Sequence, residues 1–264
     1  YWEGMDEVSE RAKPRPGASG TAPPPPPAAA RLLLLRAELA KRGLDGFIVP
    51  RGDEHQGEYV APRSERLAWL TGFTGSAGMA VVLTRRAALF SDGRYTLQAA
   101  QQVDANLYDL RHITSAPAVD WIADNLPKGG KLGYDPWLLT PAQVPRLREA
   151  CQQAGGALVP VDGNPIDAVW TDQPDHPAAP VRTHPLKYAG LGSADKRRAV
   201  ADMLKSERQD AQVLAAPDSI AWLLNIRGTD VPRTPLALSF AVIHKDATVD
   251  WFIDPAKVPP GLGR

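Results

Sequence analysis

Short apolar runs alternate with helical patterns along much of the chain, and this alternation restricts the fold more than any other feature. The runs DGFIVP (45–50), MAVVLT (79–84) and AALFSDG (87–93) have the length and composition of buried strands. Strands and helices that alternate in this way build a three-layer α/β domain. Because the last two runs are separated only by Arg85 and Arg86, we expect a tight turn between them and a partly antiparallel sheet.

The remaining elements of this first region follow the same alternation. We expect SERLAWLTGF to form a helical turn capped by Ser64, and a helix to run from Tyr95 to Val103. Further helices are expected over residues 28–43, 118–126 and 140–156, and further strands over 108–112, 131–135 and 157–161. Together these elements predict one α/β domain with a mixed sheet.

Changes in composition divide the chain into four parts. Residues 1–29 form a Pro- and Ala-rich tail without periodicity, which we expect to be disordered. Residues 30–172 form the first α/β domain, and the proline-dense residues 173–185 form a linker. A second α/β unit spans residues 186–264 and starts with a helix that Ser193 caps.

The second unit repeats the order of strands and helices but stops before it looks complete. Helices are expected over 194–209 and 218–226, and strands over 211–216, 236–244 and 248–254. The chain also begins with Tyr1 rather than Met and ends without a closing element, so we expect a fragment at both ends, with Met5 as a candidate start.

Composition excludes several classes of function. The 30 basic residues balance the 30 acidic ones, so no overall field attracts nucleic acid or an anionic membrane. A single cysteine, Cys151, excludes an internal disulfide framework and fits a reducing compartment. No apolar segment is long enough to span a bilayer. We therefore expect a cytoplasmic protein without nucleic-acid or membrane partners.

No motif in the chain predicts a catalytic centre. The glycines of TGFTGSAGM lack the dinucleotide-binding spacing and precede a strand, and Ser76 lacks the nucleophile-elbow setting. The five histidines are scattered, and only His55 lies among carboxylates, in GDEHQGEY. That cluster could hold a cation, although a solvated loop is the commoner outcome. The tryptophans, Trp222 among them, are expected to be core or interface anchors.

The segment LFSDGRYTLQAAQQ (89–102) places Arg94 where a strand passes into a helix. One interpretation is capping, in which Ser91 or Asp92 accepts the first helical N–H groups and Gly93 permits the turn. The other is display of a functional side chain, because such corners present binding residues in α/β folds. Local sequence favours capping and does not exclude display.

Five segments together resemble the N-terminal half of long-form cytosolic Xaa-Pro aminopeptidases of the M24 peptidase family, which are related to creatinase and prolidase. These segments are IVPRGDEHQGEYVAP, TGFTGSAGMAVV, LFSDGRYTLQAAQQ, PVDGNPIDAVWTDQP and DSIAWLLNIRGTDVPRTP. The resemblance covers about residues 31–256 and implies two three-layer creatinase-type N-terminal α/β domains with mixed sheets, the second incomplete here.

The resemblance also implies an activity that resides elsewhere in such a protein. A C-terminal pita-bread domain, missing from this sequence, carries two divalent metal ions, manganese or zinc, and the enzyme removes the residue before proline from a peptide. No catalytic residue or metal ligand is therefore assigned here. Arg94 is the one residue to which the resemblance assigns a role, namely contact with the bound peptide. A homodimer is the expected assembly.

Three interpretations remain open on the sequence. The first is an enzyme portion that supports dimerisation and substrate access and is inactive alone. The second is a stand-alone, non-catalytic creatinase-type domain that binds a peptide or protein. The third is a relative with other chemistry, such as amidine or dipeptide hydrolysis. The segment DSIAWLLNIRGTDVP favours the aminopeptidase over prolidase or creatinase.

Overall fold

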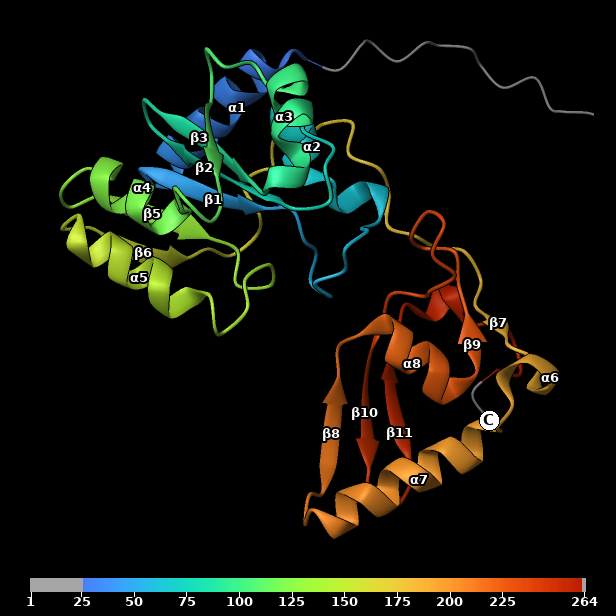
Figure 1. Cartoon of the computed structure of the whole chain (residues 1–264). Coiled ribbons are helices and arrows are strands. Elements are labelled where there is room, and N and C mark those ends of the chain that lie inside the picture. The colour runs from blue at the N-terminus through green and yellow to red at the C-terminus, as the bar shows by residue number, and fades with distance from the viewer. Residues whose placement is uncertain (1–25, 263–264) are drawn as a thin grey trace, which may run out of the picture.

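A computed structural model of the chain describes residues 26–262 and shows two α/β units (Figure 1). Most of the predicted tail, residues 1–25, lies outside the described residues. The first unit contains α1 (Ala28–Lys41), β1 (Gly46–Pro50), η1 (Pro62–Ser64), α2 (Arg66–Thr71), β2 (Gly78–Leu83), β3 (Ala87–Ser91), η2 (Gly93–Tyr95), α3 (Thr96–Gln102), β4 (Asp109–His112), α4 (Ala118–Asn125), β5 (Lys131–Tyr134), α5 (Val144–Gln153) and β6 (Ala157–Pro160).

The first unit is built on a six-stranded sheet in the order β4-β3-β2-β1-β5-β6. Strands β1, β2 and β3 pair antiparallel in succession, while β4, β5 and β6 each join by a parallel pairing. The antiparallel hairpin expected at Arg85 and Arg86 is thus confirmed, and so is the mixed sheet.

Helices cover both faces of this sheet, with α1, α2 and α3 on one side and α4 and α5 on the other (Figure 1). Successive side chains of a strand point to opposite faces. Accordingly Phe47 and Val49 of β1 pack into the core that contains Leu35 of α1, whereas Ile48 packs into the core that contains Trp121 of α4. The run FIV is apolar throughout because both faces are buried, which confirms the three-layer prediction.

The second unit is smaller. It contains β7 (Arg182–Thr183), α6 (Leu186–Ala189), α7 (Ser193–Ser206), β8 (Ala211–Leu214), α8 (Pro217–Leu224), β9 (Ile226–Arg227), β10 (Phe240–His244), β11 (Val249–Phe252) and η3 (Pro255–Lys257). Its main sheet has the order β11-β10-β8, and β7 pairs with β9 in a separate ribbon. The predicted linker 173–185 therefore includes β7, and Val181 beside it is buried in the second core.

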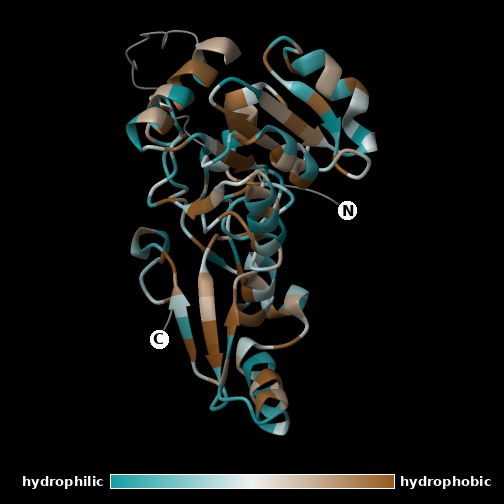
Figure 2. Ribbon diagram, turned by 90° about the vertical axis from the view of Figure 1, so that its left-hand side faces the viewer, coloured by the Kyte–Doolittle hydropathy of each residue, from teal (hydrophilic) through white to brown (hydrophobic). Residues whose placement is uncertain are grey.

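The described pairings of this second sheet differ from the mixed sheet that we expected. Strand β10 pairs antiparallel with both β8 and β11, so the mixed arrangement is found in the first unit alone among residues 26–262. Ala241 and Ile243 of β10 face α7 and α8 and form cores with Ile220 and Leu204. Hydrophobic residues concentrate on the strands of both units (Figure 2).

The second unit repeats the first half of the first unit. The order α7-β8-α8-β10-β11 matches α1-β1-α2-β2-β3, with the same antiparallel pairings. The turn after the first helix is closed identically, by Leu44 N donating to Leu39 O (2.9 Å) and by Gln209 N donating to Leu204 O (2.8 Å). Residues 28–49 thus correspond to residues 193–214, a constant difference of 165 positions.

Side chains repeat as well. Arg31 of α1 donates to the carbonyl of Trp69 and lies over its ring, with 5.5 Å between the guanidinium carbon and the ring centroid. Lys196 of α7, the counterpart of Arg31, donates to the carbonyl of Trp222 (3.0 Å) and lies 4.8 Å from that ring centroid. The segments LAWL and IAWL therefore occupy equivalent places on α2 and α8.

Two predicted helix caps are wrong. Ser64 belongs to the 3₁₀ turn η1, which runs directly into α2, so Glu65 occupies the N-cap position without a side-chain bond. Helix α7 starts one residue earlier than expected, with extended Gly192 as N-cap and Ser193 already helical.

Two other elements are shorter than predicted. Helix α5 begins at Val144 because the Gln143 side chain closes the preceding turn by accepting from Thr140 N (2.8 Å). Strand β10 begins at Phe240 because the Asp230 carboxylate takes the N–H of Leu238 (2.7 Å).

Candidate functional site

The corner after β3 is capped as the sequence suggests. Asp92 is the N-cap residue of η2 in extended conformation, and its Oδ1 accepts from the backbone N–H of Arg94 (2.9 Å). The bond satisfies one of the free N–H groups at the start of the following helical segment. The capping interpretation is therefore confirmed for Asp92.

The Arg94 side chain extends from this corner into solvent. Its guanidinium Nη2 donates to Asp92 Oδ2 at 2.7 Å, and its side chain is 63% exposed. The hydrogen bonds from Arg94 lower the pKa of the Asp92 carboxyl, and the bonds to Asp92 raise the pKa of Arg94. The ring of Tyr95 lies 5.2 Å from the guanidinium carbon. The corner is thus capped and also presents an oriented, exposed cation.

Three polar side chains continue the surface beside Arg94. The Tyr95 hydroxyl lies 2.8 Å from Ser76 Oγ, and Ser76 Oγ donates to Glu58 Oε1 (3.1 Å). The hydrogen bond with Ser76 lowers the pKa of Tyr95. Phe73 supports the Tyr95 ring edge-on, with 5.6 Å between centroids. Sequence reasoning missed this group, although the tyrosine of DGRY and the serine of TGSAG were both visible.

The carboxylate-rich loop around His55 does not form a metal site. Asp53 is buried and accepts from the backbone N–H groups of His55 (3.0 Å) and Gly57 (3.2 Å), and burial raises the pKa of its carboxyl. His55 itself stacks on Phe240 of the second unit at 4.5 Å and lies 3.0 Å from Ala215 O. Between residues 26 and 262, no three His, Cys, Asp or Glu side chains converge to hold a metal ion. The described residues therefore do not fit the metal pair that the resemblance implies.

The corresponding corner of the second unit has the same backbone and different chemistry. Asp254 accepts from the backbone N–H of Ala256 (2.9 Å), as Asp92 does from Arg94. Alanine thus stands at the Arg94 position. The next residue, Lys257, is 4% exposed and pairs with the fully buried Asp230. Of these two corners, only the first presents an exposed guanidinium.

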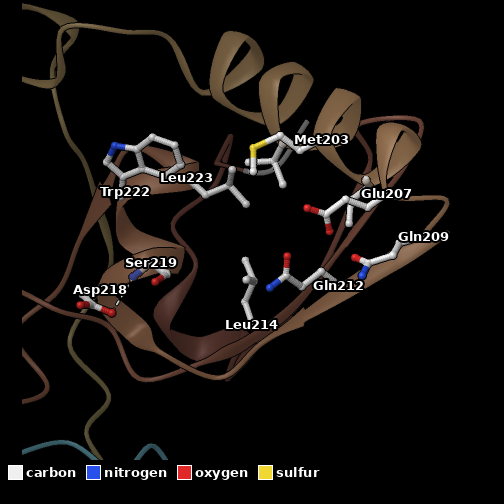
Figure 3. A pocket seen from close by; sticks show the side chains of 11 residues that line it. Met203, Glu207, Gln209, Gln212, Leu214, Asp218, Ser219, Trp222 and Leu223 are labelled. Atoms are coloured by element: carbon white, nitrogen blue, oxygen red, sulfur yellow. Dashed lines mark hydrogen bonds between the residues drawn. The ribbon is translucent and has the colours of Figure 1, made fainter.

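A groove between α7, α8 and β8 is the second feature able to bind another molecule (Figure 3). Its volume is about 390 Å³, and we call it the α7–α8 groove. It is lined by Val200, Met203, Leu204, Glu207, Gln209, Gln212, Leu214, Asp218, Ser219, Trp222 and Leu223. Trp222 is 51% exposed at its rim, so of the two expectations for this residue, core or interface anchor, the core one is wrong. The lining is apolar in the middle and carries two carboxylates and no cation.

Comparison with known proteins places this architecture in one family. The family model described as "Creatinase/Prolidase N-terminal domain" matches residues 31–169, and a second model with the same description matches residues 172–263. The chain belongs to the creatinase/prolidase N-terminal domain family.

The names of the similar proteins are more specific than the description of the family. The chain is 39% identical over 229 residues to "Probable Xaa-Pro aminopeptidase P" of Talaromyces stipitatus, covering 86% of this chain and 35% of the relative. It is 39% identical over 229 residues to "Xaa-Pro aminopeptidase ApepP" of Drosophila melanogaster, covering 85% and 37%. The chain therefore spans little more than a third of the length of these relatives.

A solved structure shares the arrangement of both units. The X-prolyl aminopeptidase of Caenorhabditis elegans, described as a cytosolic enzyme with a di-nuclear active site, aligns with a TM-score of 0.81 at 33% identity. The alignment covers 88% of this chain and 40% of that protein. Within the part of this chain that the structure describes, no helix has the length and apolar character to cross a membrane.

Proposed function

We propose that this chain is the N-terminal portion of a metal-dependent Xaa-Pro aminopeptidase, which releases the N-terminal residue preceding proline from peptides. In this proposal the chain supports dimerisation and substrate access in the cytoplasm. A following catalytic domain holds two divalent metal ions, manganese or zinc, and activates water for attack on the peptide carbonyl. The observation that carries the proposal is the similarity along both units to Xaa-Pro aminopeptidases of greater length.

In the proposed enzyme Arg94 contacts the peptide. Its support is the geometry of the corner: the Asp92 cap fixes the backbone, and the guanidinium is exposed and held by one carboxylate. A planar guanidinium can exchange that carboxylate for a peptide carboxylate or carbonyl without losing its charge. Asp92 in this view holds Arg94 in place until substrate arrives.

The gene itself provides the first test. A reading frame that continues past Arg264 and encodes aspartate, histidine and glutamate ligands is the expected result. A stop codon directly after Arg264 would contradict the proposal and favour the non-catalytic interaction domain. The purified 264-residue chain is expected to cleave no Xaa-Pro peptide at any metal concentration, because its described residues bring no ligand cluster together.

Kinetics on the longer enzyme tests Arg94. Arg94→Ala should lower kcat/KM on Xaa-Pro peptides by at least about tenfold, because a hydrogen bond to a charged group contributes roughly 1.5–3 kcal/mol. Lysine should restore only part of the activity, since it lacks the planar fork. Arg85→Ala, an exposed arginine at the other end of β3, is the matched control and should leave the kinetics unchanged. If Arg94→Ala and Arg85→Ala have the same kcat/KM, Arg94 does not contact the peptide.

A further inference from the structure

We infer that the α7–α8 groove is the docking site of a later segment of the same polypeptide, one that follows Arg264. The segment is apolar, carries an aromatic side chain that stacks on Trp222, and bears a basic residue near Glu207 and Asp218. The inference rests on the proposed function, because it requires a chain that continues beyond the second unit.

The internal repeat shows what such a groove holds when it is filled. Five apolar residues of the α7–α8 groove have buried counterparts in the first unit, whereas Met203 corresponds to the half-buried Glu38. Leu204 corresponds to Leu39, which is 3% exposed, and Trp222 corresponds to Trp69, which is 7% exposed. The remaining pairs are Val200 with Leu35, Leu214 with Val49, and Leu223 with Leu70.

In the first unit a segment far along the chain covers these residues. Strand β6 and the turn after it contribute Val159, Val161, Ile166, Val169 and Trp170 to the same core. Trp170 stacks on Trp69, with 5.4 Å between ring centroids and 20° between ring planes. Lys196 lies over the ring of Trp222 as Arg31 lies over Trp69, but Trp222 is half exposed and lines the groove (Figure 3). The groove is thus the place that the counterpart of this segment would fill.

Charge at the rim indicates the chemistry of the missing segment. In the first unit two arginines bind the covering segment, residues 159–170. Arg42 donates to Gly163 O (2.6 Å), and Arg66 donates two hydrogen bonds to the Asp167 carboxylate (2.7 and 2.8 Å). In the second unit the Arg42 position is Glu207, and the Arg66 position is Ser219, next to Asp218. Arg42 is thus replaced by a carboxylate and Arg66 by a hydroxyl, and the lining of the groove holds Glu207 and Asp218 without a cation. The complementary positive charge must therefore come from the segment that docks.

Spacing along the chain puts the occupant beyond Arg264. In the first unit 67 residues separate the end of β3 at Ser91 from Val159, where the cover begins. In the second unit only 12 residues follow the end of β11 at Phe252. The relatives are long enough to supply the rest, since the chain spans 35% and 37% of their length.

Thiol labelling of Ser219→Cys tests the inference. Ser219 is small, exposed and part of the groove lining, so cysteine fits there without rearrangement. The natural Cys151 stays silent because it is fully buried and burial raises the pKa of its thiol to about 11. The variant should react freely with an uncharged thiol reagent in the 264-residue chain, and at least about tenfold more slowly in the longer protein, where the groove is covered.

Ser206→Cys is the matched control. Ser206 ends α7 and corresponds to Lys41, whose side chain is 74% exposed in the first unit, so its labelling rate should be the same in both proteins. Equal labelling of Ser219→Cys in a longer protein that cleaves Xaa-Pro peptides would overturn the inference and leave the proposed function standing. A gene that ends at Arg264 overturns both. Protection that appears in the 264-residue chain only at high concentration would identify a second copy as the occupant and also overturn the inference.

Discussion

The two units share one framework and differ in what covers it. In the first unit both faces of the sheet are buried, and Ile48 and Phe90 on the α4–α5 side are fully inaccessible. Their counterparts in the second unit are Val213 and Phe252, which are 71% and 58% exposed. The same strands, with the same register, therefore lie between two layers of helices in one unit and beneath a single layer in the other.

This difference separates what neighbouring residues determine from what distant ones determine. The bounds of the first helix, the strand register and the corner cap are the same in both units, and each depends only on the elements that both units contain. Burial differs because the covering elements of the first unit, β5, β6, α4 and α5, all lie after β3 in the chain. The repeated framework thus forms in both units, although the elements that cover its second face in the first unit have no counterpart among the described residues of the second unit.

The largest expected contrast is between the two equivalent tryptophans. Trp69→Ala should lower the free energy of unfolding of the first unit by about 3–5 kcal/mol, because it removes a buried, stacked ring. Trp222→Ala should cost only about 1 kcal/mol, because half of that side chain already contacts water. Urea unfolding followed by circular dichroism measures both. Equal losses would mean that the α7–α8 groove is covered in the chain itself.

The second contrast concerns the lysine at the second corner. Lys257→Met should destabilise the second unit by about 3–5 kcal/mol, because it leaves the carboxylate of Asp230 buried without its partner. Lys245→Met breaks an ion pair with Asp210 in which both side chains are exposed, and it should change stability by no more than about 0.5 kcal/mol. Thermal unfolding of the two variants compares a buried pair with a surface pair in one unit. Similar melting temperatures would contradict the buried pairing.

A third pair of variants should show no contrast. Asp92→Ala and Asp254→Ala each remove one side-chain cap of the same geometry, so each should cost about 1 kcal/mol in its own unit. Asn at either position should restore most of the loss, since its side-chain oxygen can still accept. A cost at Asp92 alone would show that its pairing with Arg94, rather than the cap, stabilises that corner.

The smallest effect is expected at the turn after the first helix of each unit. The first unit has Gly43 there with φ of 66°, and the second has Arg208 with φ of 57°. A residue with a side chain is strained in this left-handed region, so Arg208→Gly should stabilise the second unit by up to about 1 kcal/mol. Gly43→Arg should destabilise the first by a similar amount. Effects of the same sign in both units would show that the two turns are not equivalent.

The framework was largely predictable from the sequence because its signals are local. The apolar run FIV, the adjacent strands at Arg85 and Arg86, and the DGRY corner each carry their own pattern, and each formed as expected. The caps at Ser64 and Ser193 failed because neighbouring residues, a 3₁₀ turn and Gly192, took the capping position. A side chain 18 residues away in sequence is invisible to such patterns, which is why the Ser76–Glu58 bond was missed.

The exposure of Trp222 could not be predicted from its own helix. The pattern of IAWLL matches a buried helix, and the homologous position on α2 is buried. What decides its exposure is whether a later segment lies across it, and no signal for that lies within the helix. The role of Arg94 depends in the same way on a domain that its own segment does not contain, and it stays a prediction.

The position of β8 at the edge of its sheet affects how the isolated chain behaves at high concentration. A strand edge next to an exposed apolar side chain can pair with any other strand that approaches it. Solutions of this chain should therefore scatter light increasingly as protein concentration and temperature rise. Val213→Lys places a charge on the exposed side of β8 and should delay the turbidity while leaving the melting temperature nearly unchanged. We therefore expect solubility and folding stability to vary separately in this molecule, with solubility set by the exposed face and edge of the β11-β10-β8 sheet.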